Sequence, residues 1–124
     1  MSCKVLVVDD SQSTREFLAA AVEQLPGVEV VLSSGAVEAL KLLPRHRFDL
    51  IITDINMPDI NGLELINFVK KNPNYRETPL FIVTGQGREQ DRERGLQLGA
   101  SEFLVKPLAP DHLSSLVRRY LKVA

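Results

Sequence analysis

Four short, mostly apolar runs in this sequence each end in side chains that could do chemistry. The runs span residues 5–8, 50–53, 80–83 and 103–105. The side chains that follow them are, in chain order, Asp9 and Asp10, Asp54, Thr84 and Lys106. If the runs are strands of one parallel sheet, these side chains meet in one crevice, because ligands bind at the carboxyl ends of such strands. We therefore expect one site built from residues far apart in the chain.

The predicted crevice holds more negative than positive charge. The three aspartates would repel one another, and Lys106 supplies a single fixed positive charge against them. A hard divalent cation such as Mg²⁺ would supply the rest, since it binds carboxylates, waters and phosphate oxygens. This set suits the receipt of a phosphoryl group, with an aspartate as the nucleophile. Lys106 and the metal would neutralise the transferring oxygens, and the Thr84 hydroxyl would donate a hydrogen bond.

Segments with helical periodicity alternate with the apolar runs and predict the elements that position the site. Another apolar run, at residues 28–32, completes five predicted strands. The helical segments span residues 17–25, 36–43, 63–71, 88–98 and 113–121. Strands that alternate with helices predict an α/β fold whose parallel sheet is covered on both faces. Right-handed crossovers make it a three-layer, doubly wound sandwich.

Local signals agree with these boundaries. Ser11 or Ser13 could cap the first helix, and Pro110 suits the first turn of the last one. Gly62 indicates either a helix start or a close approach of the backbone. The segments that should end the other helices are Pro26-Gly27, Pro44, Asn72-Pro73-Asn74 and Gly99.

Composition excludes several classes of protein. The chain has 124 residues, of which 44% are hydrophobic and 25% charged, as expected for one globular domain. With a net charge of −1, the chain lacks the positive field that nucleic-acid binding needs. The longest apolar runs are far too short for a membrane span, and the single cysteine, Cys3, favours a reducing compartment. We therefore expect a cytoplasmic protein without direct nucleic-acid binding or membrane insertion.

The ordered motifs resemble those of the receiver domain of two-component response regulators, most of all the stand-alone chemotaxis type. The motifs are Val7-Val8-Asp9-Asp10-Ser11, the block from Asp54 to Gly62, Thr84-Gly85 and Lys106-Pro107. Each is weak alone, but their order and their places at strand ends are specific. The resemblance covers residues 1–124 as a single receiver domain without an output domain. It implies a flavodoxin-like sheet with strand order 2-1-3-4-5.

The resemblance also implies a role for each site residue. Asp54 is the phosphoacceptor, supplied by a histidine kinase, a phosphotransfer protein or a small acyl phosphate. Asp10, Asp54 and the backbone carbonyl of Asn56 bind Mg²⁺, or Mn²⁺ in its place, while Asp9 helps mainly through water. Lys106 pairs with the phosphoryl oxygens and is aimed by a cis peptide bond before Pro107.

In the same family, phosphorylation changes a surface. Thr84 moves toward the phosphoryl group, and Phe103, where many relatives have tyrosine, swings inward or is simply part of the core. The surface of the helix at 88–98, the strand at 103–105 and the last helix then binds a protein target. Asn56 and Gln86, each two residues beyond a site residue, tune the phosphoryl lifetime. The domain, a monomer or weak dimer, catalyses only its own phosphorylation and dephosphorylation.

Other interpretations fit less well. An enzyme with an aspartyl-phosphate intermediate would need an acid two residues after Asp54, where this chain has Asn56. A flavin-binding domain would need a phosphate-cradling first loop, but residues 9–12 are too acidic. The intact pocket argues against a degenerate receiver that is never phosphorylated. A stand-alone regulator and a receiver from a longer polypeptide both fit the sequence.

Overall fold

The computed structural model describes residues 2–122, in which strands and helices alternate along the chain. The strands are β1 (Cys3–Val8), β2 (Val28–Ser33), β3 (Leu50–Thr53), β4 (Leu80–Thr84) and β5 (Glu102–Val105). The helices are α1 (Gln12–Glu23), α2 (Ala36–Leu42), α3 (Gly62–Lys71), α4 (Glu89–Leu98) and α5 (Pro110–Leu121). All strand pairs are parallel, in the order β2-β1-β3-β4-β5. The predicted fold class and strand order are confirmed.

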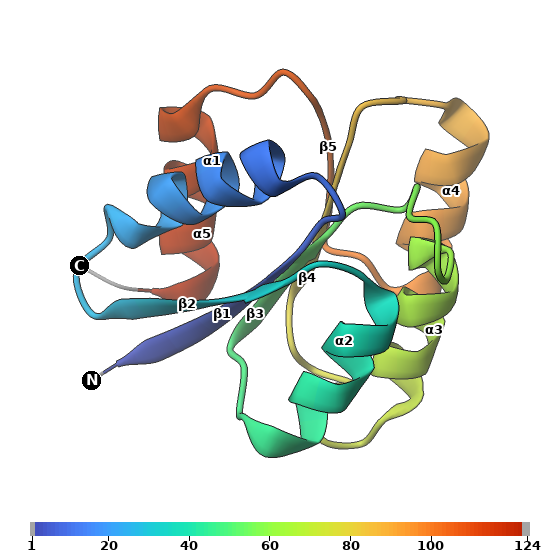
Figure 1. Cartoon of the computed structure of the whole chain (residues 1–124), viewed down its shortest axis with the longest axis horizontal. Helices are drawn as coiled ribbons and strands as arrows, with labels where there is room; N and C mark the ends of the chain where they lie inside the picture. The colour runs from blue at the N-terminus through green and yellow to red at the C-terminus, as the bar shows by residue number, and fades with distance from the viewer. Residues whose placement is uncertain (1, 123–124) are drawn as a thin grey trace.

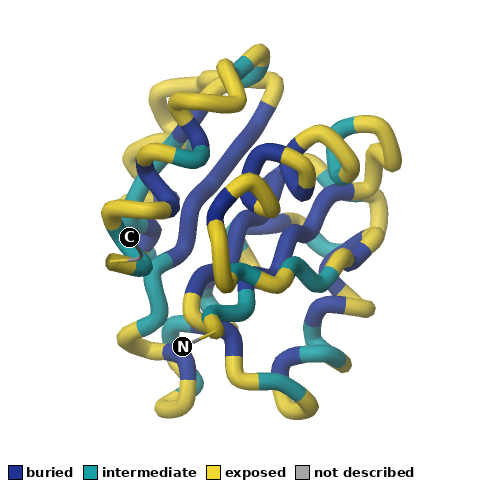
Figure 2. The backbone as a smooth tube through the Cα atoms, turned by 90° about the vertical axis from the view of Figure 1, so that its left-hand side faces the viewer, coloured by how far each residue is buried: buried dark blue, intermediate teal, exposed yellow. Residues whose placement is uncertain are grey.

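The helices cover the two faces of the sheet unequally. Helices α1 and α5 lie on one face, and α2, α3 and α4 lie on the other (Figure 1). Successive strand residues point to opposite faces, so Val5 and Val7 pack under α1 and α5 while Leu6 and Val8 pack under α2 and α3. The tube in Figure 2 shows the same layering, with a buried sheet between helices that are exposed on their outer sides.

Local capping explains where several helices begin and end. The Ser11 side chain accepts a hydrogen bond from the Thr14 amide at 3.4 Å and caps α1. Asn61 caps α3 in the same way, through the Leu63 amide at 2.8 Å. Pro110 occupies the first turn of α5, and Gly99 ends α4 with a left-handed φ of 116°.

Some boundaries differ slightly from the sequence-based expectation. Helix α2 ends at Leu42, and a short 3₁₀ turn over Leu43–Arg45 follows, because Pro44 cannot continue the α-helical hydrogen bonds. Strand β4 extends through Thr84, which pairs with Val105 of β5. Thr84 is therefore the last residue of a central strand rather than the first residue of a loop.

Helix α4 is the least anchored of the helices. Gly95 is its only fully buried residue among those described, whereas α5 buries Leu113, Leu116 and Val117. A Cβ atom at Gly95 would collide with the Cδ1 atom of Ile82, so glycine lets α4 approach the sheet. The charged stretch at 88–94 is mainly exposed, as its sequence predicted. Among residues 2–122, no helix is both long and apolar enough to cross a membrane.

Candidate functional site

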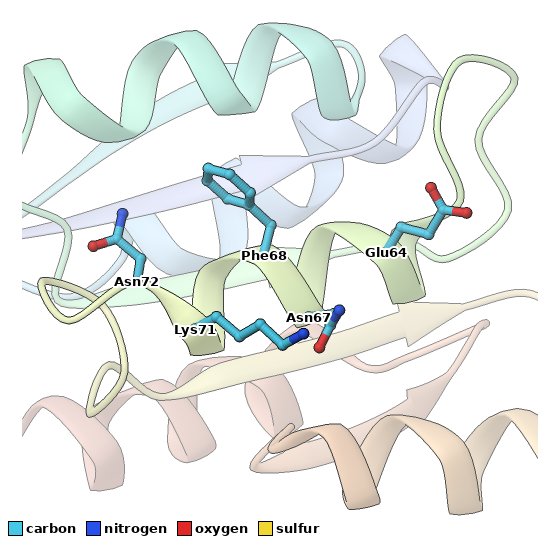
Figure 3. Close-up of a pocket in the computed structure, with 5 residues that line it drawn as sticks. All are labelled: Glu64, Asn67, Phe68, Lys71 and Asn72. Atoms are coloured by element: carbon cyan, nitrogen blue, oxygen red, sulfur yellow. The ribbon is translucent and has the colours of Figure 1, made fainter.

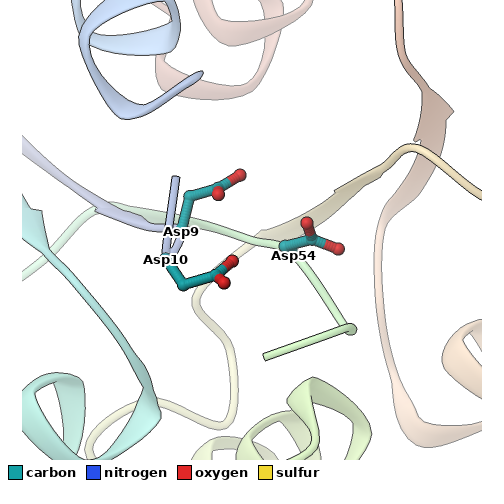
Figure 4. A group of neighbouring side chains, drawn as sticks. All are labelled: Asp9, Asp10 and Asp54. Atoms are coloured by element: carbon teal, nitrogen blue, oxygen red, sulfur yellow. The ribbon is translucent and has the colours of Figure 1, made fainter. Parts of the chain in front are cut away.

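The three aspartates meet at the carboxyl ends of two neighbouring strands. Strand β1 pairs with β3, with Val8 opposite Thr53, so the residues that follow each strand lie side by side. One carboxylate oxygen from each of Asp9, Asp10 and Asp54 lies within 4.8 Å of the others (Figure 4). Asp9 is fully buried, Asp54 is 7% exposed, and Asp10 is exposed. Among the three aspartates, solvent therefore reaches mainly Asp10 and, to a small extent, Asp54.

Lys106 brings a positive charge into this cluster from the end of β5. Its Nζ atom lies 3.0 Å from Oδ2 of Asp9 and 3.1 Å from Oδ2 of Asp54. Burial alone would lower the pKa of Lys106, but its hydrogen bonds and charge interactions with the two carboxylates outweigh burial and raise it. Lys106 is therefore charged at neutral pH. The peptide bond between Lys106 and Pro107 is cis.

Asp54 is held on both of its carboxylate oxygens. Oδ1 accepts hydrogen bonds from the amides of Ile55 at 2.6 Å and Asn56 at 3.2 Å, while Oδ2 faces Lys106. Behind it, Gly62 packs so closely that an added Cβ atom would overlap the Asp54 carbonyl oxygen. Both expectations for Gly62, the helix start and the close approach, are confirmed. The carboxylate has little freedom to rotate.

Asp9 is fixed by the first turn of α1. Its Oδ1 atom accepts a hydrogen bond from the Ser11 amide at 2.9 Å, and Oδ2 pairs with Lys106. The Arg15 guanidinium also donates to the Asp9 backbone carbonyl at 2.7 Å. Sequence analysis missed Arg15; the available signal was a basic residue in the first turns of a helix, where acidic residues are favoured.

Three further predicted residues lie at the ends of β3 and β4. Thr84 is buried, and its Oγ1 atom lies 3.4 Å from both the Asn56 side-chain nitrogen and the Gln86 amide. The Asn56 and Gln86 side chains are exposed.

Phe103 lies opposite Ile82 in the sheet register and is partly buried against the α2 and α3 face. Phe103 thus packs against the core from its margin.

The cluster has the donor set and the charge that a divalent cation requires. Three carboxylates and one ammonium leave two uncompensated negative charges, if all four groups are ionised. Carboxylate oxygens are the ligands that Mg²⁺ and Mn²⁺ prefer. The residues present therefore fit a divalent metal.

A separate hollow lies on α3 and has different chemistry. It is lined by Glu64, Asn67, Phe68, Lys71 and Asn72 (Figure 3). Phe68 is 52% exposed there, and none of the predicted site residues lines the hollow. It offers no pairing of a nucleophile with a base, so the acidic cluster is the candidate site.

Fold and site together define a doubly wound α/β domain with an acidic pocket, suited to a divalent metal, at the switch point of its sheet. Residues 5–118 match the response regulator receiver domain, and the chain belongs to that family. Receiver domains are phosphorylation-based switches of two-component systems rather than classical enzymes. They bind a divalent metal at an aspartate cluster, and they work with kinase or phosphotransfer partners and protein targets.

Several known proteins resemble the whole chain. An uncharacterised 14.6 kDa protein of Leptolyngbya boryana is 38% identical over 116 residues, covering 94% of this chain and 88% of that protein. A chemotaxis protein CheY homolog of Campylobacter jejuni is 35% identical, covering 89% of this chain and 85% of the relative. The solved structure of Vibrio cholerae CheY4 has a TM-score of 0.89 and 34% identity, covering 97% of this chain and 99% of CheY4. Other relatives are longer than this chain, which covers 51% of the length of one of them and 27% of the length of another.

Proposed function

We propose that this chain is a phosphorylation-operated switch in which Asp54 accepts the phosphoryl group. The observation that carries the proposal is the restraint of the Asp54 carboxylate. One of its oxygens is held by two backbone amides, and the other lies 3.1 Å from Lys106. An oriented carboxylate beside a fixed cation is the arrangement that in-line phosphoryl transfer needs. The donor would be a histidine kinase, a phosphotransfer protein or a small acyl phosphate.

In the transfer step, an Asp54 carboxylate oxygen forms a bond to phosphorus while the donor's bond to phosphorus breaks. The leaving group departs with that bonding pair, as an imidazole from phosphohistidine or a carboxylate from an acyl phosphate. Lys106, already charged in the pocket, stabilises the negative oxygens of the phosphoryl group. The Thr84 hydroxyl, at the end of the neighbouring strand, donates to the same group once it arrives.

The proposed metal ligands are the carboxylates of Asp10 and Asp54 and the backbone carbonyl of Asn56, with Asp9 acting mainly through water. The metal would be Mg²⁺, with Mn²⁺ as an alternative. When bound, the cation would neutralise charge on the phosphoryl oxygens. The close approach of the three carboxylates and their uncompensated charge support this proposal.

We further propose that phosphorylation changes the surface formed by α4, β5 and α5. New phosphoryl oxygens would compete with Asp9 for Lys106, draw Thr84 toward them and leave space behind Thr84 for Phe103. Helix α4 is suited to move in response, because it buries only Gly95 among its described residues. A protein target would bind this surface with different affinity in the two states. Asn56 and Gln86, both exposed at the pocket edge, would set the rate of water attack on the phosphoryl group.

The remaining parts of the proposal concern the setting. Residues 1–124 would act as a single receiver domain, as a monomer or weak dimer. Its action would be cytoplasmic and would involve no direct contact with nucleic acid, consistent with the free Cys3 and the net charge of −1. The catalysis would be limited to the domain's own phosphorylation and dephosphorylation.

Labelling with a small acyl phosphate tests the assignment of Asp54. With Mg²⁺ present, the wild type and Asp111→Ala should each gain the mass of one phosphoryl group, and Asp54→Ala should gain none. Asp111 is an exposed aspartate in the first turn of α5 and serves as the matched control. Equal labelling of Asp54→Ala and the wild type, measured by intact mass spectrometry, would contradict the proposal.

A further inference from the structure

The N-terminus of α2 is capped by a residue from a distant loop. Its own N-cap residue is Gly35, which has no side chain to accept a hydrogen bond. Instead, Asp59 Oδ2 accepts from the Val37 amide at 2.9 Å, and Asp59 Oδ1 lies 3.4 Å from the Ala36 amide. Asp59 belongs to the loop between β3 and α3, and its Oδ1 also accepts from the Ile60 amide of that loop at 2.8 Å.

Gly35 and Asp59 fit each other. A Cβ atom at Gly35 would lie 2.7 Å from Oδ2 of Asp59, so a larger residue would displace the carboxylate from the helix end. The hydrogen bond from the Val37 amide lowers the pKa of Asp59; burial opposes this shift, and the hydrogen bonds from Ile60 and Ala36 add to it, so that the pKa is lowered overall. The carboxylate is therefore charged at neutral pH and interacts favourably with the positive end of the helix dipole.

The loop that carries Asp59 is the one that follows Asp54. Its base is closed by the Gly62 amide, which donates to the Ile55 carbonyl at 2.9 Å. Between these two points, Asn56 turns its side chain toward Thr84, and Asp59 attaches the loop to α2. A loop held at its base and in its middle samples fewer conformations than one held at the base alone.

We propose that Asp59 is a positioning residue for the metal site: by tying this loop to α2, it holds the Asn56 carbonyl where a divalent cation binds. The inference rests on the proposed function, in which that carbonyl is a metal ligand. Helix α2 acts as the fixed support, since Ala36 and Ala39 are completely buried against the sheet. If the loop is freed, part of the free energy of metal binding is used to order the loop, and the affinity for the metal falls.

Glu38 offers a matched control at the same helix end. Its Oε1 atom accepts a hydrogen bond from the Ser34 amide at 2.8 Å, so it also stabilises the start of α2. The hydrogen bonds described for Glu38 do not involve the loop that follows Asp54. Glu38→Ala therefore removes a comparable capping contact without releasing that loop.

The test is Mg²⁺ affinity measured by titration calorimetry for the full chain and three variants. Asp59→Ala should bind about threefold to tenfold more weakly than the wild type, less than the tenfold to hundredfold typical when a partner directly hydrogen-bonded to a ligand is lost. Asp59→Asn keeps one acceptor oxygen, so its Mg²⁺ affinity should lie between those of the wild type and Asp59→Ala. Glu38→Ala should bind like the wild type. In the metal-free protein, the amides of residues 56, 57 and 59–61 should exchange faster in Asp59→Ala than in the wild type or Glu38→Ala.

Two results would overturn the inference while leaving the proposed function intact. One is wild-type affinity in Asp59→Ala; the other is an equal loss in Glu38→Ala, which would mean that helix stability alone governs binding. A wild-type chain that binds no divalent cation would instead overturn the proposed function, and this inference with it.

Discussion

At the residue scale, the site depends on how tightly the backbone is packed around Asp54. Gly62 lies so close to the Asp54 carbonyl that a Cβ atom would not fit, and the Asp54 side chain is held by amides and by Lys106. Lys106 in turn compensates only part of the negative charge of its carboxylate partners. The pocket thus combines a rigid nucleophile with an excess of negative charge, and a bound cation or a phosphoryl group changes that charge.

Gly62→Ala should destabilise the fold by about 1–3 kcal/mol, because the added methyl group overlaps fixed backbone that cannot move aside. Urea unfolding monitored by circular dichroism measures the change. Labelling by acyl phosphate should also fall, since relief of the overlap shifts Asp54.

Gly85→Ala is the control for this substitution. It lies beside Thr84, and nothing stands within 4 Å of where its Cβ atom would be. Its free energy of unfolding should change by no more than about 0.5 kcal/mol. Equal effects of the two substitutions would refute the argument from backbone contact.

At the element scale, the helices differ in what holds them. Helix α5 buries a full apolar stripe, α2 buries Ala36 and Ala39 and is also capped by Asp59, and α4 is polar and approaches the sheet through Gly95. Helices α2 and α4 therefore rely more on polar or close contacts than α5 does. Such contacts can be altered by a change of charge, which is what a switch requires.

The cap on α2 should make stability depend on pH in a defined direction. The pKa of Asp59 is lowered from 3.8 in the folded chain, so its contribution is complete above pH 3.8 and is lost as pH falls through the folded value. When the pH falls from 6 into the acidic range, the free energy of unfolding should therefore decrease less in Asp59→Asn than in the wild type. Urea unfolding across this range provides the comparison. A larger loss in Asp59→Asn would contradict the direction of the shift.

At the scale of the whole molecule, the pocket and the proposed output surface share strand β5. Lys106 immediately follows β5 and reaches the acidic cluster, while Val105 is exposed and Phe103 contacts the core. A change of partner at Lys106 can therefore be transmitted through β5 to α4 and α5. The loosely anchored α4 is the element where the largest displacement is expected.

Fluoroberyllate, which mimics a phosphoryl group, should reveal this coupling in NMR spectra. With Mg²⁺ present, resonances of Thr84, Phe103 and α4 should shift, and those of the α1 residues remote from the pocket should change least. Without Mg²⁺, or in Asp54→Ala, the shifts should be absent. Unchanged spectra in the wild type with Mg²⁺ would favour a degenerate receiver over a switch.

Most of the fold followed from short-range patterns. The apolar runs predicted the strands because both faces of a parallel sheet are buried. Ser11 acts through a side-chain hydrogen bond three residues away, and Pro110 and Gly99 act through their own backbone geometry. Boundaries near Pro44 and Thr84 were less precise. Near Pro44 the α-helix gives way to a 3₁₀ turn rather than to a loop, and at Thr84 the end of the strand depends on pairing with β5.

The sequence by itself determined the element order, the convergence of the three aspartates and Lys106, and the family. Strand-end positions predict the convergence, since ligands bind at the carboxyl ends of parallel strands, and the ordered motifs predict the family and its strand order. Only the tertiary structure decided which carboxylate oxygens face Lys106, that Arg15 holds the Asp9 carbonyl, and that Asp59 caps α2. These contacts join residues whose side chains have several allowed directions, and packing between layers, rather than local spacing, selects one of them.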